Sequence, residues 1–236
     1  MEFLTDALAW FADPVHWRGT DGVPARMLEH LYYSGVATLV AVLLALPAGL
    51  AAGHTGRGGA LAVNVANAGR ALPTFGLVLL VVTLVGLGDL SIFLPLVAFA
   101  VPPILTNAYA GIRAVDPDVR DAAAGVGMTG LQVLWRVELP VALPLVLAGI
   151  RTSAVQVVAT ATLAAYAGSG GLGRYIVNGF AVRDFPQVFA GALLVALFAI
   201  AVELAFGRLQ ALVVPKGVAA RLAEANADAK MTAAAA

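Results

Sequence analysis

Segment 113–140 contains the residues whose types and spacing could do chemistry in this 236-residue chain. It holds seven of the 28 charged residues (14 basic and 14 acidic), between two long apolar stretches. Mixed acids and bases suit ionic contacts with another protein, and the small residues 122–124 would let such a partner approach the backbone closely. The alternative is a solvated connector. The charged residues are Arg113, Asp116, Asp118, Arg120, Asp121, Arg136 and Glu138.

Capping signals predict a first short helix in this segment. Asp116 is a good N-cap, Pro117 suits the first helical position, and Gly127 can end the helix in a left-handed conformation. A connector does not need this much capping, so the pattern favours a structured elbow that serves as a contact site.

A second short helix is predicted over residues 130–138. Thr129 with Gln132 matches the capping box, in which each side chain accepts a hydrogen bond from the other residue's backbone N–H. Leu139 precedes Pro140, and the residue before a proline disfavours the helical conformation. We therefore expect two helices joined by a glycine, the second of them ending before the next apolar stretch.

The chain lacks the residues of a nucleotide-hydrolysing loop. A Walker A loop needs a lysine followed by serine or threonine, because these side chains contact phosphate and Mg²⁺. The two lysines, Lys216 and Lys230, are followed by Gly217 and Met231. The chain is therefore not a P-loop ATPase. We expect no cofactor in this chain, so ATP and Mg²⁺, if its function depends on them, would bind a separate ATPase subunit.

Four further patterns give no catalytic or ligand site. Residues 168–173 match the glycine spacing of a dinucleotide loop but lack the preceding strand, so we expect a flexible turn that could belong to an outer gate. Gly49 and Gly53 form a GxxxG pattern, which either packs helices closely or arises by chance among 25 glycines. The three histidines are isolated and predict no metal site. Zero net charge gives no bulk attraction to nucleic acid.

Two sets of polar residues lie inside apolar stretches, where polar groups are costly and therefore candidates for function. Thr152, Gln156 and Thr160 recur every four residues, on one face of a helix. They line a substrate path or make hydrogen bonds between helices, and the pattern does not decide. Asn67 and Arg70 share a face of an earlier span, where the arginine should face protein, water or headgroups rather than lipid.

The elements that position these residues are membrane-spanning helices. The chain is 61% hydrophobic and 12% charged, with a mean hydropathy of +0.90. A soluble domain of this size cannot bury so much apolar surface, which excludes a soluble enzyme. We predict an all-α, polytopic membrane protein, with Pro73 and Pro144 as break points in its two longest apolar stretches. The five expected spans are Leu31–Ala52, Gly58–Gly88, Leu90–Ile112, Pro140–Gly173 and Phe185–Val202.

The two ends and the orientation follow from composition. Residues 1–30 are expected to form a short helix lying in the membrane interface, with an unstructured tail as the alternative. Residues 31–208 form the transmembrane domain and 209–236 a cytoplasmic tail. Eight basic residues on one side against four on the other favour an outside N-terminus and a cytoplasmic C-terminus. The expected cytoplasmic segments are 53–60, 113–139 and 203–236.

The elbow resembles the EAA loop of ABC-importer permeases. That pattern is Glu-Ala-Ala, three residues, Gly, nine residues, Ile, one residue and Leu-Pro. This chain has the same spacing, with Asp in place of Glu and Val in place of Ile. The matching residues are Asp121, Ala122, Ala123, Gly127, Val137, Leu139 and Pro140.

Flanking motifs narrow the resemblance to permeases of osmoprotectant importers, which take up glycine betaine, carnitine or choline. The similarity extends over roughly 31–179. One departure is that the family usually has Gln-Thr-Ile-Pro-Ser where this chain has Arg70-Ala71-Leu72-Pro73-Thr74. The matching stretches are 111–117, 127–129, 137–144, 148–152, 159–165 and 170–173.

The resemblance implies a type I ABC-importer permease fold in the cell membrane and a function in transport. In such a system the elbow docks into a groove on a cytoplasmic ATPase subunit, and Asp121 contacts that subunit or caps a helix. An external binding protein delivers the substrate. Because an ATPase dimer needs two docking loops, the permease should work as a dimer with an identical or paralogous copy.

Two other functions are compatible with parts of the pattern. A permease for amino acids or another small solute would share the elbow. An ion-coupled secondary transporter would predict inverted repeats and a buried titratable relay, and the sequence has no convincing case of either.

Overall fold

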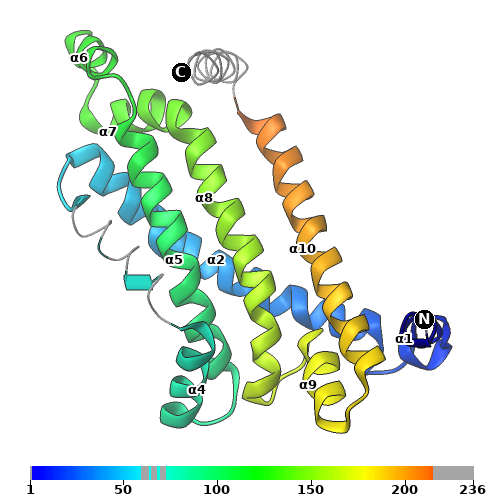
Figure 1. Ribbon diagram of the computed structural model, residues 1–236. Coiled ribbons are helices and arrows are strands. Elements are labelled where there is room, and N and C mark those ends of the chain that lie inside the picture. The colour runs from blue at the N-terminus through cyan, green and yellow to red at the C-terminus, as the bar shows by residue number, and fades with distance from the viewer. Residues whose placement is uncertain (1, 60–63, 65–67, 70–72, 215–236) are drawn as a thin grey trace, which may run out of the picture.

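A computed structural model describes residues 2–59, 64, 68–69 and 73–214, and every regular element within them is a helix (Figure 1). Among these residues, four helical segments are long and apolar enough to cross a membrane; they contain α2 (Val23–Thr55), α5 (Asp89–Arg113), α8 (Leu139–Thr160) and α10 (Phe185–Val213). The shorter elements are α1 (Glu2–Ala12), η1 (Pro14–Trp17), α4 (Thr74–Val85), α6 (Pro117–Gly125), α7 (Gly130–Val133), η2 (Leu134–Glu138), η3 (Ala161–Ala167) and α9 (Gly173–Val182).

The expected span over 58–88 is described only in part. Its second half is α4, a 12-residue apolar helix. Pro73 lies in extended conformation immediately before α4, so the break expected at this proline is confirmed. Most of the first half lies outside the described residues, and the count of five spans stays a prediction.

The helix stop expected before Pro140 is wrong. Residues 130–160 form one helical run, in which the π-helical turn η2 joins α7 to α8. Within this turn the N–H of Leu139 donates to the carbonyl of Leu134, five residues back. A proline lacks an N–H, and its ring clashes with the carbonyl four residues back in a regular α-helix. The wider π turn just before Pro140 accommodates both effects.

The break expected at Pro144 is also wrong, because α8 continues through this residue to Thr160. The expected 140–173 span is longer than one straight crossing, and its C-terminal residues do not continue the α-helix. They form the 3₁₀ turn η3 and a glycine-rich loop over 168–172, which leads into α9.

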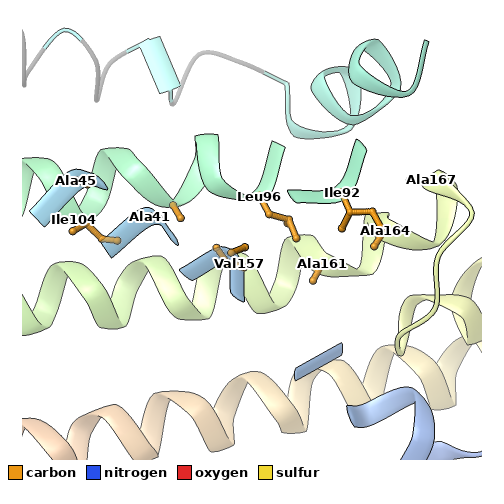
Figure 2. Close-up of a cluster of buried hydrophobic side chains, with 11 residues drawn as sticks. Ala41, Ala45, Ile92, Leu96, Ile104, Val157, Ala161, Ala164 and Ala167 are labelled. Carbon is orange, nitrogen blue, oxygen red and sulfur yellow. The ribbon is translucent and has the colours of Figure 1, made fainter. Parts of the chain in front are cut away.

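Helix α5 packs against α2 and α8, and α8 lies between α5 and α10 (Figure 1). Figure 2 shows the buried cluster at this junction, in which α2 presents alanines at four-residue spacing. Side chains this small let the helix backbones approach closely, and such close packing is what holds helices together in lipid. The buried residues are Ala37, Ala41, Ala45, Ile92, Leu96, Ala100, Ile104, Val157, Ala161, Ala164 and Ala167.

The GxxxG pattern packs α2 against α5. A Cβ at Gly49 would lie 2.8 Å from the carbonyl oxygen of Leu105, and one at Gly53 would lie 2.7 Å from Cβ of Ile112. Both distances are too short for carbon, so the two glycines set how closely the helices approach. This contact confirms the packing interpretation of the pattern.

Gly53→Ala is therefore expected to lower the thermal stability of the purified protein, because overpacking of this kind costs about 1–3 kcal/mol. Gly35→Ala is the matched control, since a Cβ at Gly35 on the same helix meets no atom within 4 Å. It should leave the melting temperature unchanged or slightly raised. Equal melting temperatures for the two variants would contradict close packing at Gly53.

The N-terminal residues form α1, as the helical interpretation of this segment predicted. The helix packs against α10, where the rings of Phe3 and Phe189 meet edge to face at 5.6 Å. Helix α2 begins at Val23, inside the segment expected to precede the first span. The interfacial location of α1 stays a prediction.

Candidate functional site

The elbow between α5 and α8 has the predicted capping. The Asp116 carboxylate accepts from the N–H of Asp118 at 2.9 Å and caps α6. Thr129 and Gln132 form both bonds of the capping box. Gly127 has φ of +85°, the left-handed conformation predicted for it. We call this end of the bundle the elbow end, and the opposite end, with α4 and α9, the far end (Figure 1).

The seven EAA-like residues differ in their exposure to solvent. Asp121, Ala122 and Gly127 are exposed, and a Cβ at Gly127 would meet no atom within 4 Å. Ala123 is buried. Val137 in the π turn η2 is half-buried, as are Leu139 and Pro140 at the start of α8.

Three large apolar side chains that the pattern did not single out are exposed beside them. Val126 is 80% exposed, Leu131 66% and Trp135 55%. These residues belong to a charged segment, where apolar side chains on the surface indicate a protein contact. The elbow therefore combines an exposed carboxylate, a small-residue face and apolar side chains.

Glu138 ties the elbow to the rest of the protein. Its side chain is only 1% exposed, although it belongs to the charged segment. His54 Nδ1 at the end of α2 lies 2.6 Å from one carboxylate oxygen, and Arg120 Nε on α6 lies 3.1 Å from the other. Arg120 also donates to the carbonyl of Ile112 near the end of α5. One buried carboxylate thus connects both arms of the elbow to two long helices.

A polar cavity of about 410 Å³ lies between α5 and α8. The predicted polar stripe of Thr152, Gln156 and Thr160 lines it, so the structure brings these three residues to one wall. Asn67 and Arg70, the other predicted pathway residues, lie outside the described residues. The remaining lining residues are Gly69, Thr74, Phe99, Pro102, Pro103, Asn107 and Ala159.

The part of the cavity wall that the structure describes offers hydrogen-bonding groups without charge. Asn107 opposes the stripe from α5, and its side-chain amide donates to the Pro103 carbonyl at 2.8 Å. Hydroxyls, amides and one aromatic ring can contact a small polar solute. Within the described lining no general base accompanies the threonine hydroxyls to activate them as nucleophiles.

Residues 41–217 match the family model for the binding-protein-dependent transport system inner membrane component. The chain belongs to this family. It is a permease subunit of an ABC importer, a multi-pass membrane protein and not an enzyme.

Proteins similar in sequence to this chain include several named transport permeases. The permease is 34% identical over 190 residues to the glycine betaine/carnitine/choline transport system permease protein OpuCB of Bacillus subtilis, covering 80% of this chain and 88% of the relative. It is 33% identical to the choline transport system permease protein OpuBB of the same organism, covering 82% and 89%. It is 34% identical to the osmoprotectant import permease protein OsmW of Salmonella typhimurium, covering 80% and 91%.

Solved structures share the fold. The inward-facing MetNI methionine ABC transporter gives a TM-score of 0.70 at 21% identity, covering 86% of this chain and 99% of that one. An amino acid ABC transporter with histidines gives 0.64 at 19% identity, covering 90% and 97%. These likenesses confirm the permease fold expected from the elbow.

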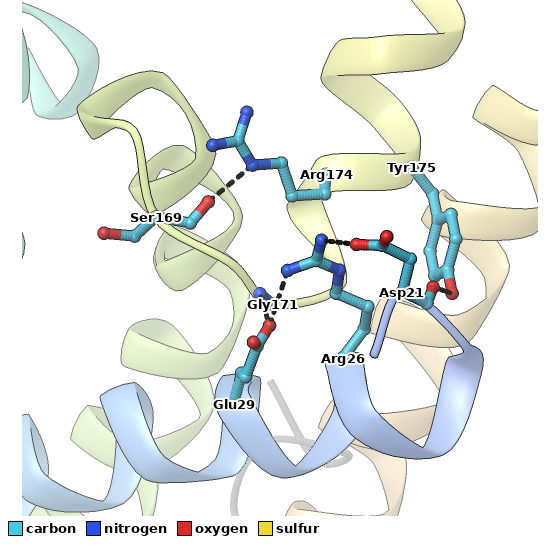
Figure 3. A network of polar contacts seen from close by, with 7 residues as sticks. All are labelled: Asp21, Arg26, Glu29, Ser169, Gly171, Arg174 and Tyr175. Carbon is cyan, nitrogen blue, oxygen red and sulfur yellow. Dashed lines mark hydrogen bonds and ion pairs between the residues drawn. The ribbon is translucent and has the colours of Figure 1, made fainter. Parts of the chain in front are cut away.

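At the far end of the permease, a carboxylate holds the glycine-rich loop that follows η3 (Figure 3). Glu29 on α2 accepts from the N–H of Gly171 at 2.7 Å and pairs with Arg26 at 2.8 Å. Arg26 also pairs with Asp21, whose carbonyl accepts from the Tyr175 hydroxyl at 2.6 Å. Burial raises the pKa of Tyr175 to about 12, so this hydroxyl stays protonated and remains a donor at physiological pH. The loop is thus held to α2, which the sequence did not predict.

We expect Glu29→Leu to release this loop, because a hydrogen bond to a charged group contributes about 1.5–3 kcal/mol, less where it is partly exposed as here. A cysteine at Thr160 should then react faster with an impermeant thiol reagent added on the far side. The chain has no other cysteine to react. Asp89→Leu, at the start of α5, is the control. Unchanged labelling in the Glu29 variant would show that this carboxylate does not control access to Thr160.

Proposed function

We propose that this permease imports a quaternary-ammonium osmoprotectant such as glycine betaine, carnitine or choline. The supporting observation is that relatives covering about 80% of the chain at 33–34% identity are named for these solutes. The cavity is consistent with this substrate class, because its described lining offers neutral polar groups and an aromatic ring to a solute that carries fixed charge. The amino acid transporters among the structural neighbours share about a fifth of the sequence and support the fold alone.

We assign the elbow as the surface that contacts the ATPase subunit. In this proposal the elbow end is cytoplasmic, the N-terminus is outside, and the exposed group of Asp121, Ala122, Gly127 and Trp135 contacts the groove of the ATPase. ATP and Mg²⁺ bind that partner. An external binding protein releases substrate at the far end, and a second permease copy, identical or paralogous, completes the pathway.

Uptake by cells that express the complete system tests the substrate. Labelled glycine betaine, carnitine and choline should accumulate, and accumulation should cease when ATP is depleted while the ion gradient is clamped. Calorimetry on the binding protein encoded beside the permease gives an independent test. Failure of that protein to bind any quaternary amine would refute the substrate assignment.

The ATPase contact has its own test. The ATPase subunit should co-purify with the permease, and Asp121→Lys or Gly127→Val should remove it. The first variant reverses an exposed charge, and the second places a β-branched residue at φ of +85°. Arg183→Gln, exposed at the far end, should leave co-purification unchanged.

A further inference from the structure

Helix α5 carries two consecutive prolines, and both line the cavity. In an α-helix the carbonyl of one residue accepts from the N–H four residues later. Pro102 and Pro103 have no N–H, so the carbonyls of Ala98 and Phe99 lose this donor. By helix geometry each of these carbonyls is directed toward a proline that lines the cavity, and Phe99 itself also belongs to the lining.

Three side chains close to these prolines donate to other carbonyls, Asn107 among them, which donates to Pro103. Thr106 donates to Pro102 at 2.7 Å, and Ser153 on α8 donates to Ala100 at 2.9 Å. Among the described residues, no side chain donates to the carbonyls of Ala98 and Phe99. Inside a membrane, backbone groups without partners are tolerated where they line a polar cavity.

We propose that these two carbonyls, with the Phe99 ring, form a binding site for the quaternary-ammonium head of the transported solute. The inference rests on the proposed function for its substrate class. A quaternary ammonium ion has no N–H, so hydrogen bonds cannot hold it, whereas carbonyl dipoles and aromatic faces attract its charge. Carbonyl dipoles attract a cation less strongly than a carboxylate would, so a solute held by them can also leave.

Cysteine protection in the assembled transporter tests this site without depending on uptake. The natural chain has no cysteine, so Ala159→Cys places a single thiol on the cavity wall. Tetramethylammonium should slow its modification, whereas neutral tert-butanol of similar size should not. Adding Pro102→Ala and Pro103→Ala restores the backbone donors and should weaken protection about tenfold, since non-hydrogen-bonding attraction of a desolvated cation is of the size that gives such a factor.

Pro95→Ala is the matched control, because Pro95 is a buried proline of the same helix outside the cavity lining. It should preserve protection. Equal protection by the neutral solute, or protection that survives the double variant, would overturn the carbonyl site while leaving the uptake assay positive. Absence of both protection and uptake for every quaternary amine would instead refute the proposed function.

Discussion

Glu138→Gln is expected to reduce ATP-driven uptake by at least about tenfold, because it breaks a buried ion pair whose loss costs about 3–5 kcal/mol. The substitution keeps the size of the side chain and removes its charge. His54 and Arg120 would then face a neutral amide in a site where Glu138 is almost fully buried. Their positive or polar groups would have to rearrange or reach solvent.

The expected consequence is a loose elbow rather than an unfolded protein. Glu138 joins η2 to α6 through Arg120 and to α2 through His54, so its loss frees both arms of the elbow from the bundle. The partner ATPase could still move the elbow when it binds ATP and closes, but this movement would not be transmitted to the long helices. We therefore expect hydrogen exchange to rise over 117–138 and ATP hydrolysis to continue without uptake.

Arg136→Gln is the control for this experiment. Arg136 lies two residues before Glu138 on the same π turn, is exposed, and makes no ion pair among the described residues. Its substitution should leave uptake and exchange close to the wild type. If the Glu138 variant transports normally with an unchanged exchange pattern, the carboxylate does not couple the elbow to the bundle.

The sequence predicted the elbow well because capping is a local property. Asp116 binds a backbone group two residues away, and Thr129 and Gln132 bind each other's backbone three residues apart. The role of Glu138 depends instead on His54, 84 residues earlier in the chain. Nothing in the spacing of the two residues indicates that they meet, although each lies beside the end of an apolar stretch.

The difference between local and long-range interactions also explains the two wrong predictions about helices, at Pro140 and at Pro144. Composition and length predicted the long apolar helices, because burial in lipid depends on both. The rule that a residue before proline avoids the helix is also local, and at Pro140 the π turn overrides it. Packing of α8 against α5 and α10 supports the continuous helix through Pro144.

Two charged residues on the long helices pair with each other, and the sequence alone did not identify this pairing. Charged groups at or within a membrane tend to pair with one another. The structure pairs Arg151 on α8 with Glu203 on α10, 52 residues apart. Each residue alone was compatible with an interfacial or solvated position, and only the packing of α10 on α8 brings them together.

Gln156→Trp is expected to abolish uptake without affecting the ATPase contact. Gln156 lines the cavity between Thr152 and Thr160, and an indole there would occupy much of a space of about 410 Å³. Gln156→Leu keeps the side-chain volume roughly constant and removes the amide, so it tests the polarity of this side chain separately from its shape. If the stripe contacts the solute, the leucine variant should raise KM while the tryptophan variant transports nothing.

The control must add the same bulk to a membrane helix without entering the cavity. Leu197 on α10 is 54% exposed and lies outside the cavity lining, so Leu197→Trp should transport normally. Co-purification of the ATPase subunit should be intact in all three variants, since none of them touches the elbow. Normal uptake by Gln156→Trp would mean that the solute takes another route and that the stripe serves helix packing, the alternative that the sequence left open.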